Sequence, residues 1–473
     1  MFISKLQLLK APTRIKDLCL LISSLFIVYL LLLLHQPQTL PPHHHHHLPT
    51  TTTTATATSP TTLRHLVFSV ASSSRTFPNR QSYLRLWHRP NSTRVFVFLD
   101  RPTSNSSAAD DLPPTVVSAD TSSFPYSFPR GNPAAVRIAR IVKEIVLRNE
   151  SDVRWFVFGD DDTLFFADNL VRTLSKYDHN QWYYVGSSSE SYQQNAQGTF
   201  DMAYGGGGFA ISQSLARVLA GALDSCLVRY PHLYGSDARV YSCLAELGVG
   251  LTREPGFHQV DLRGNMFGML TAHPLSPVLS LHHLDFMEPI FPNMTRTQAF
   301  EHLFKAVNVD PARVLQQTIC YDRANSLTVS VAWGYAVQVF EGNHLLPDLL
   351  PLQRTFRTLR RNKSLLSSLY MFNTREQFSD PCKRPVVFFL RSVASGSNKV
   401  TTDYTGHIVG NCSRTRAVDN LKQIRVFSQK PDFDIVEVKA LRRQCCDILP
   451  SSNRLMAINI RQCGVDELIS MQT

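Results

Sequence analysis

Three consecutive carboxylates, Asp160, Asp161 and Asp162, are the clearest sign of chemistry in this sequence. They follow an apolar run, residues 154–159, whose β-forming side chains predict a buried strand, and apolar sequence resumes directly after them. Adjacent carboxylates repel one another, and burial increases that cost. Because open α/β sheets bind ligands at strand ends, we expect the aspartates to hold Mn²⁺ or Mg²⁺, and the ion to hold a diphosphate.

Two further motifs offer groups that such a site needs. Residues 205–208 are four glycines followed by apolar sequence, so the backbone there can approach a ligand closely or make a tight bend against a neighbour. The pattern is neither G-x-G-x-x-G nor a Walker loop. Asp237 precedes an amphipathic helix that reaches Leu247, so it could serve as a general base or as a helix N-cap.

Histidines supply a third candidate group. His282 and His283 end an apolar, strand-like stretch, where either ring could be a metal ligand or a structural histidine. The repeat of residues 43–47 is interpreted as a solvated part of a linker. No C-x-x-C pair is present, which argues against a zinc site.

The elements around these motifs alternate between strand and helix. Strands are expected at residues 65–70 and 94–99, helices at 80–87, 133–148, 167–177 and 213–226, and a long surface loop at 101–132. This alternation predicts an α/β fold with a doubly wound, mostly parallel sheet. From about residue 326 the sequence becomes strand-rich, which predicts a mainly β, Cys-rich appendage over 326–473 without a visible catalytic constellation.

The charge of the chain narrows its possible partners. Its 473 residues suffice for two or three domains, and the net charge is +11. This excess suits anionic ligands such as nucleotide sugars or acidic glycans. The basic residues are too dispersed for a nucleic-acid-binding protein, because no Lys/Arg run with interleaved aromatic residues occurs.

The N-terminal region predicts a membrane anchor. Residues 18–34 form an apolar run that basic residues precede, which indicates a cytosolic tail over 1–17 and a signal-anchor transmembrane helix over 18–34. A cleaved signal peptide is the alternative. Residues 35–62 are rich in Pro, Thr and Ala and predict an extended stem. The short span favours a single-pass type II protein of the Golgi membrane with a lumenal body.

Cysteines and sequons fit a lumenal body. Besides Cys19 in the predicted span there are eight cysteines, an even number compatible with disulfides, whose connectivity the sequence leaves open. Six N-x-S/T triplets are candidate glycosylation sites: Asn91, Asn105, Asn149, Asn293, Asn362 and Asn411.

The order of motifs resembles a known family. Over about residues 63–290 the sequence is similar to the fringe-like branch of the inverting β-1,3-glycosyltransferases, and specifically to plant proteins that carry the domain of unknown function 604. The matching residues are Arg80 with Arg85-Leu86-Trp87, Trp155-Phe156 before the three aspartates, Gly205 to Gly208 with Phe209-Ala210, Asp237 with Cys243 on its helix, and Ser280-Leu281-His282-His283.

This resemblance implies roles for individual residues. Residues 63–325 would form a GT-A-like glycosyltransferase domain, with Asp237 as the general base. The metal ligands would be Asp162 and His283, or its neighbour His282. A disulfide would join Cys226 to Cys243. The sequence departs from the family at Ser236, because the family often has an acidic residue directly before the base. The expected donor-binding residues are Asp160, Asp161, Arg80, Gly206 and Gly207.

The expected function is transfer of a hexosyl or N-acetylhexosaminyl group from a UDP-sugar to a hydroxyl of a glycan or glycoconjugate. The resemblance implies inversion at the anomeric carbon, a β-1,3 linkage and dependence on Mn²⁺ or Mg²⁺. The alternative is a non-catalytic lumenal protein that binds glycans or acts as a scaffold on the same fold. The aspartates together with Asp237 favour the enzyme, since a scaffold needs neither.

Overall fold

A computed structural model describes residues 22–30, 60–103, 111–273, 277–359, 365–407, 410, 412–430, 440–450 and 454–471. The chain divides into two compact units, Met1–Ser59 and Pro60–Thr473. In the first unit, the described residues, 22–30, are helical.

The predicted membrane topology is wrong. Across the described part of the chain, no helix combines the length and the apolar character that crossing a bilayer requires. This finding overturns the prediction of a single-pass type II Golgi membrane protein anchored by residues 18–34. The predicted tail, the flanks of the predicted span and the stem up to residue 59 lie outside the described residues.

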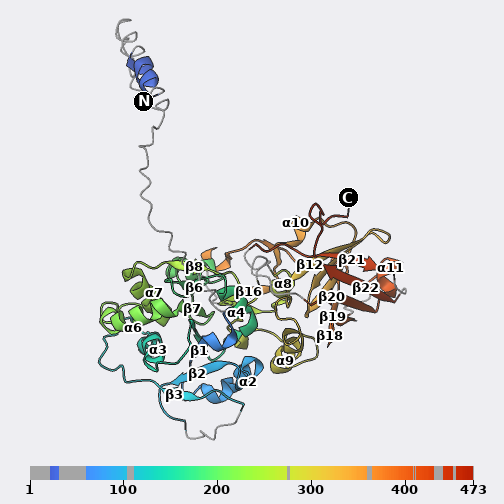
Figure 1. Ribbon diagram of the computed structural model, residues 1–473. Coiled ribbons are helices and arrows are strands. Elements are labelled where there is room, and N and C mark those ends of the chain that lie inside the picture. The colour runs from blue at the N-terminus through green and yellow to red at the C-terminus, as the bar shows by residue number, and fades with distance from the viewer. Residues whose placement is uncertain are drawn as a thin grey trace, which may run out of the picture. The chain divides into compact units, whose positions relative to one another are not determined.

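The second unit contains a seven-stranded mixed sheet in the order β3-β2-β1-β4-β7-β6-β8 (Figure 1). β1 pairs in parallel with β2 and β4, whereas β7 runs antiparallel to both of its neighbours. The predicted α/β sheet is therefore confirmed, and its assignment as GT-A stays a prediction. The strands are β1 (Leu66–Ala71), β2 (Arg94–Leu99), β3 (Thr115–Val117), β4 (Trp155–Asp160), β6 (Tyr184–Gly186), β7 (Phe209–Ser212) and β8 (Leu251–Arg253).

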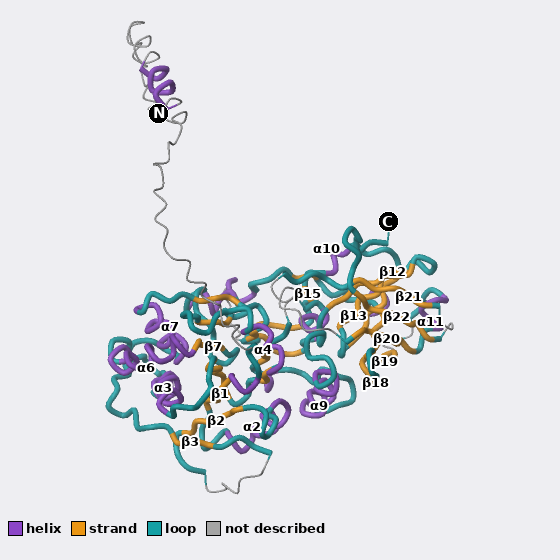
Figure 2. The backbone as a smooth tube through the Cα atoms, viewed as in Figure 1, coloured by secondary structure: helices purple, strands orange, loops and turns teal. Residues whose placement is uncertain are grey.

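Helices cover both faces of this sheet (Figure 2). On β4, Phe156 and Phe158 pack into the core beneath α3, α6 and α7, while Trp155 and Val157 join the core on the opposite face. Because both faces of β4 are covered, its side chains are apolar on both faces, as the sequence indicates. The larger helices are α2 (Phe77–Trp87), α3 (Ala134–Leu147), α4 (Ala167–Leu174), α6 (Gln213–Leu227), α7 (Ser236–Glu246) and α9 (Arg296–Val307).

A small sheet lies where β4 ends. β5 (Leu164–Phe165) follows the aspartates and pairs antiparallel with β11 (Ser280–Leu281), which pairs in parallel with β9 (Phe257–His258). Each of these strands has only two residues, so no sequence periodicity could reveal them. The pairing of β5 with β11 brings segments more than one hundred residues apart in sequence to the same place.

The C-terminal part is built on an eight-stranded sheet in the order β12-β13-β14-β18-β19-β20-β22-β21. The expected β-rich, disulfide-linked region is confirmed, although its first strand begins at Gln317, before the predicted boundary at residue 326. The disulfide Cys320–Cys446 joins β12 to β21. The strands are β12 (Gln317–Asp322), β13 (Leu327–Ala332), β14 (Ala336–Glu341), β18 (Val386–Ser395), β19 (Lys399–His407), β20 (Gln423–Gln429), β21 (Cys445–Leu449) and β22 (Leu455–Arg461).

Shorter elements connect these parts. The predicted loop over residues 101–132 contains β3, which adds to the sheet edge because the amide of Ser118 donates to the carbonyl of Leu99 (2.9 Å). The remaining elements are η1 (Leu63–His65), α5 (Tyr192–Gln197), β10 (Leu262–Gly264), α8 (Phe267–Thr271), η2 (Leu284–Phe286), α10 (Leu346–Leu349), β15 (Leu352–Gln353), β16 (Phe356–Thr358), η3 (Leu365–Ser368), β17 (Thr374–Arg375), η4 (Pro381–Lys383) and α11 (Arg416–Asn420).

Candidate functional site

The turn after β4 fixes the three aspartates at the end of the strand. The amide of Thr163 donates to the carbonyl of Asp160 (3.0 Å), and the amide of Asp160 donates to the Thr163 hydroxyl (2.8 Å). That hydroxyl donates in turn to the carbonyl of Gly206 (2.7 Å). Thr163 therefore ties the aspartate turn to the glycine-rich bend.

His282 meets two of the aspartates directly after β11. Its Nε2 lies 3.1 Å from an oxygen of Asp162 and 3.7 Å from an oxygen of Asp160. One ligand atom from each of the three residues lies within 4.8 Å of the others. Two carboxylates and an imidazole suit Mn²⁺ or Mg²⁺. The Nδ1–H of His282 donates to the carbonyl of Gln259 (3.2 Å), a contact of the kind that orients metal-binding histidines.

His283 has a different environment. Its Nδ1 lies 3.2 Å from the carbonyl oxygen of Val260 and 3.3 Å from a carboxylate oxygen of Asp261. Residue 283 adopts the left-handed conformation, with φ at 54°. Of the two histidines that the sequence offered, the structure places His282 beside the aspartates.

The charges of this cluster influence one another. Burial opposes a charge on His282, but the carboxylates of Asp162, Asp160 and Asp261 outweigh burial and raise its pKa to about 9. Burial also opposes the charge of Asp162, yet His282 and Arg80 hold the pKa of that carboxyl below its usual range. Asp160 is 39% exposed. Desolvation, opposed by His282 and reinforced by the other carboxylates, raises its pKa to about 7.

Arg80 reaches this cluster from α2. Its two terminal nitrogens lie 2.6 Å from an oxygen of Asp162 and 2.8 Å from an oxygen of Asp285. Asp285 also accepts a hydrogen bond from the hydroxyl of Tyr83 (2.5 Å). The predicted donor-binding arginine is thus beside the candidate metal ligands and is held by two carboxylates.

Asp161 makes contacts of another kind. Its Oδ2 accepts hydrogen bonds from the hydroxyls of Ser72 (2.6 Å) and Thr76 (2.8 Å). The side chain is buried, and burial raises its pKa. Asp161 therefore fastens the connection between β1 and α2, and its expected role in donor binding stays a prediction.

The glycine-rich bend packs against His282. A Cβ on Gly206 would lie 2.1 Å from the His282 ring, and one on Gly207 would lie 2.9 Å from the amide nitrogen of Gln259. The amide of Gly207 donates to the side chain of Gln259 (2.5 Å). Both glycines are buried, so the bend makes room for His282, and their role in donor binding stays a prediction.

Asp237 lies in the first turn of α7, where Gly235 occupies the N-cap position. Its carboxylate accepts hydrogen bonds from the amides of Ala238 (2.9 Å) and Gly205 (3.5 Å). Burial raises its pKa, although these hydrogen bonds oppose the shift. Asp160 and Asp237 line the same small cavity. The structure also pairs Cys226 with Cys243, on α6 and α7, as the resemblance implies.

The sequence did not reveal a buried polar network behind His282. Asp261, beside His283, accepts a hydrogen bond from the Ser189 hydroxyl (2.5 Å). Glu190 contacts His258 Nδ1 (3.0 Å) and accepts from the amide of Val260 (2.7 Å). The signal available was weak: three polar residues fall within 258–261, between Phe257 and Leu262.

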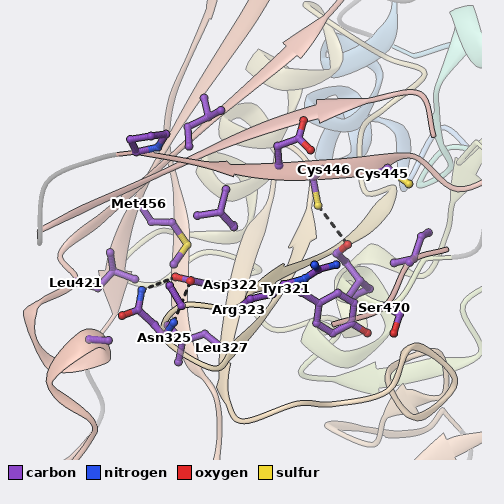
Figure 3. Close-up of a pocket in the computed structure, with 18 of the residues that line it drawn as sticks. Tyr321, Asp322, Arg323, Asn325, Leu327, Leu421, Cys445, Cys446, Met456 and Ser470 are labelled. Carbon is purple, nitrogen blue, oxygen red and sulfur yellow. Dashed lines mark hydrogen bonds between the residues drawn. The ribbon is translucent and has the colours of Figure 1, made fainter. Parts of the chain in front are cut away.

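A larger cavity, of about 1350 Å³, lies in the C-terminal part (Figure 3). None of the predicted site residues lines it, and the carboxylate of Asp322 accepts hydrogen bonds from its own turn, from the amide (3.1 Å) and side chain (2.8 Å) of Asn325. Nearby, Cys445, Cys463 and Glu467 are close enough to share an ion. The two thiols are joined in a disulfide, however, so they offer no thiolates.

Three of the candidate glycosylation sites can be placed. Asn91, Asn149 and Asn293 are exposed, and all three have positive φ. Asn105, Asn362 and Asn411 lie outside the described residues. Glycosylation at all six stays a prediction.

Comparisons with known proteins agree with the resemblance seen in the sequence. The family model described as "Protein of unknown function, DUF604" matches residues 194–446, more than half of the chain. A protein named "Beta-1,3-glucosyltransferase" from Homo sapiens is 30% identical over 120 residues, which are 25% of this chain and 23% of that protein. Its namesake from Mus musculus is 31% identical over the same shares. The chain thus spans about a quarter of the length of these relatives.

Proposed function

This chain belongs to the DUF604 family of proteins of unknown function, and we propose that it is a metal-dependent glycosyltransferase. Its donor would be a UDP-sugar, and its acceptor a hydroxyl of a glycan or glycoconjugate. The observation that carries this proposal is the convergence of Asp160, Asp162 and His282 on one point, next to the half-buried carboxylate of Asp237. The names of the two mammalian relatives support the same reaction class.

Asp160, Asp162 and His282 are the residues that would hold the ion. A divalent cation bound there would neutralise the negative charge that develops on the diphosphate leaving group. Arg80 adds a fixed positive charge beside Asp162. With the ion bound, its charge and that of Arg80 would offset the three carboxylates of Asp160, Asp161 and Asp162, while His282, as a ligand, would be neutral.

Asp237 would accept the proton of the acceptor hydroxyl. The hydroxyl oxygen attacks the anomeric carbon from the face opposite the leaving group, so the new C–O bond forms as the bond to the phosphate oxygen breaks. The proton passes to the Asp237 carboxylate, and UDP departs with the bonding electrons. A raised pKa suits this task, because a stronger base accepts a proton more readily. The product has inverted configuration.

An enzyme explains these side chains better than a glycan-binding scaffold does. Burying carboxylates beside one another is costly unless something compensates. Two hydrogen bonds from hydroxyl groups stabilise the buried carboxylate of Asp161. The side chain of Asp160 is instead partly exposed, and it lines a small cavity together with Asp237. A scaffold would not need this arrangement.

The test is UDP release from a panel of UDP-sugars by the full chain with Mn²⁺. We expect Asp162→Ala to reduce release by more than about 100-fold, since even outer partners of metal ligands are worth 10- to 100-fold. The matched control is Asp168→Ala, which removes an exposed ion pair with Arg89 and should leave activity unchanged. Wild-type chain that binds UDP-sugars but never releases UDP would support the non-catalytic alternative.

A further inference from the structure

An aromatic pair on the surface includes the residue that precedes the N-cap of α7, the helix that carries the proposed base. The rings of Phe128 and Tyr234 meet edge to face with centroids 5.2 Å apart. Phe128 is 37% exposed and Tyr234 is 58% exposed. Single exposed aromatic residues are common on protein surfaces, but two rings from distant segments that contact each other in solvent form a continuous apolar platform.

The backbone of Tyr234 leads directly into the turn that carries Asp237. Tyr234 directly precedes Gly235, the N-cap of α7. A Cβ on Gly235 would lie 2.3 Å from Oδ1 of Asp237, so the carboxylate folds back over the backbone of residue 235. Tyr234 is therefore the direct neighbour in sequence of the residue over which the carboxylate of Asp237 lies.

Buried groups hold the platform in place. Arg239 is fully buried and donates to the carbonyls of Gly235 (2.9 Å) and Pro231 (3.3 Å). Its guanidinium also lies over the ring of Tyr126, 4.9 Å from the centroid. The Tyr126 hydroxyl donates to the carbonyl of Tyr234 (3.1 Å). A second link joins the two segments, because the amide of Ser127 donates to the carbonyl of Pro231 (2.9 Å).

We propose that Phe128 and Tyr234 form the acceptor subsite, on which a pyranose ring of the acceptor glycan stacks with its hydroxyl directed toward Asp237. The proposal rests on the proposed function. A pyranose with equatorial substituents presents axial C–H groups on its face, and these pack well on an aromatic ring. A platform that is already fixed loses little conformational entropy when a ligand binds. It can therefore orient a pyranose ring although each stacking contact is weak.

Binding is tested separately from catalysis. Saturation-transfer NMR on the full chain, with irradiation of aromatic protons, uses methyl β-D-glucopyranoside and methyl β-D-galactopyranoside as probes. We expect saturation to reach the axial ring protons of at least one probe, and Phe128→Ala and Tyr234→Ala each to weaken binding about three- to tenfold. Tyr234→Phe should retain the signal. Trp182→Ala removes an aromatic side chain with similar exposure, 47%, and should also retain it.

The two proposals fail in different ways. If wild-type chain releases UDP but Phe128→Ala and Tyr234→Ala leave probe binding and the acceptor KM unchanged, the subsite is overturned and the reaction stands. If the probes bind through the platform but no UDP-sugar is turned over, the platform is a glycan-binding site, and both the reaction and the acceptor role are overturned. An unchanged thermal unfolding midpoint in both alanine variants separates lost stacking from lost folding. If either midpoint falls, Tyr234→Phe decides: loss of binding in that variant contradicts stacking.

Discussion

The three consecutive aspartates have different environments, although the sequence presents them as equivalent. Asp160 and Asp162 face His282, while Asp161 accepts two hydroxyl hydrogen bonds on the other side of the turn. Asp160 ends β4, whereas Asp161 and Asp162 lie in the turn that the hydrogen bond from the amide of Thr163 to the carbonyl of Asp160 closes. Only the two outer carboxylates can therefore share an ion with the histidine.

Asp237 is the residue whose role is most open to a direct test. Asp237→Asn preserves the shape of the side chain but cannot accept a proton from the acceptor hydroxyl. We expect transfer to fall by about 100-fold or more, the scale of general-base catalysis, with the affinity for UDP and Mn²⁺ nearly unchanged. Steady-state kinetics and calorimetry measure the two quantities. Equal loss of both would indicate a structural carboxylate at the start of α7.

At the scale of elements, the sequence predicted the framework but not the small sheet that completes the site. The continuous apolar run of β4 and the amphipathic periodicity of α3 are both strong signals, so both elements were predictable. β5, β9 and β11 have two residues each, too few for any pattern. The choice between His282 and His283 also depends on the left-handed conformation of residue 283, which sequence does not specify.

The bend at Gly206 is predicted to be essential for the orientation of His282. Gly206→Ala would place a methyl group 2.1 Å from the ring, so the ring must move. We expect Mn²⁺ affinity to fall about 10- to 100-fold, measured by calorimetry. The control is Gly221→Ala on α6, where a Cβ meets nothing within 4 Å. That change should leave Mn²⁺ affinity unaltered and slightly stabilise the helix. Mn²⁺ affinity in Gly206→Ala equal to that of wild type would contradict this role for the bend.

An ion-pair cluster centred on Arg461 lies at the end of the C-terminal sheet. Arg461 on β22 contacts Glu467 through two nitrogen–oxygen pairs (2.6 and 2.8 Å), as well as Asp447. The hydrogen bonds from Arg461, followed by the amide of Gly464, lower the pKa of Glu467 to about 2. A depressed carboxyl pKa contributes stability above the ordinary value near 4.3. This contribution is lost as the pH falls toward 2.

The predicted consequence is a pH-dependent difference in stability. Glu467→Gln should lower the thermal unfolding midpoint at pH 6, and the difference from wild type should shrink steadily as the pH falls below about 4. Differential scanning calorimetry at several pH values measures this. The neighbouring change Asp466→Asn serves as the control. A difference that is constant between pH 6 and pH 3 would show that the ion pair does not couple to folding.

At the scale of the whole molecule, one core extends from the α/β sheet into the C-terminal sheet. Phe68 of β1, Phe300 of α9 and Val329 of β13 belong to the same buried cluster. The change of composition near residue 326 marked a region of different character, but the sheet itself begins at Gln317. Composition records the average content of a segment, whereas pairing between β12 and β13 depends on register.

The central claim is that Asp160, Asp162 and His282 hold a divalent ion that binds a diphosphate. The most direct measurement is anomalous diffraction from crystals of the chain grown with Mn²⁺ and UDP. We expect a manganese peak within bonding distance of the carboxylate of Asp162 and Nε2 of His282, with the diphosphate of UDP on its open side. Ordered UDP with no such peak, or a manganese ion bound elsewhere in the chain, would contradict it.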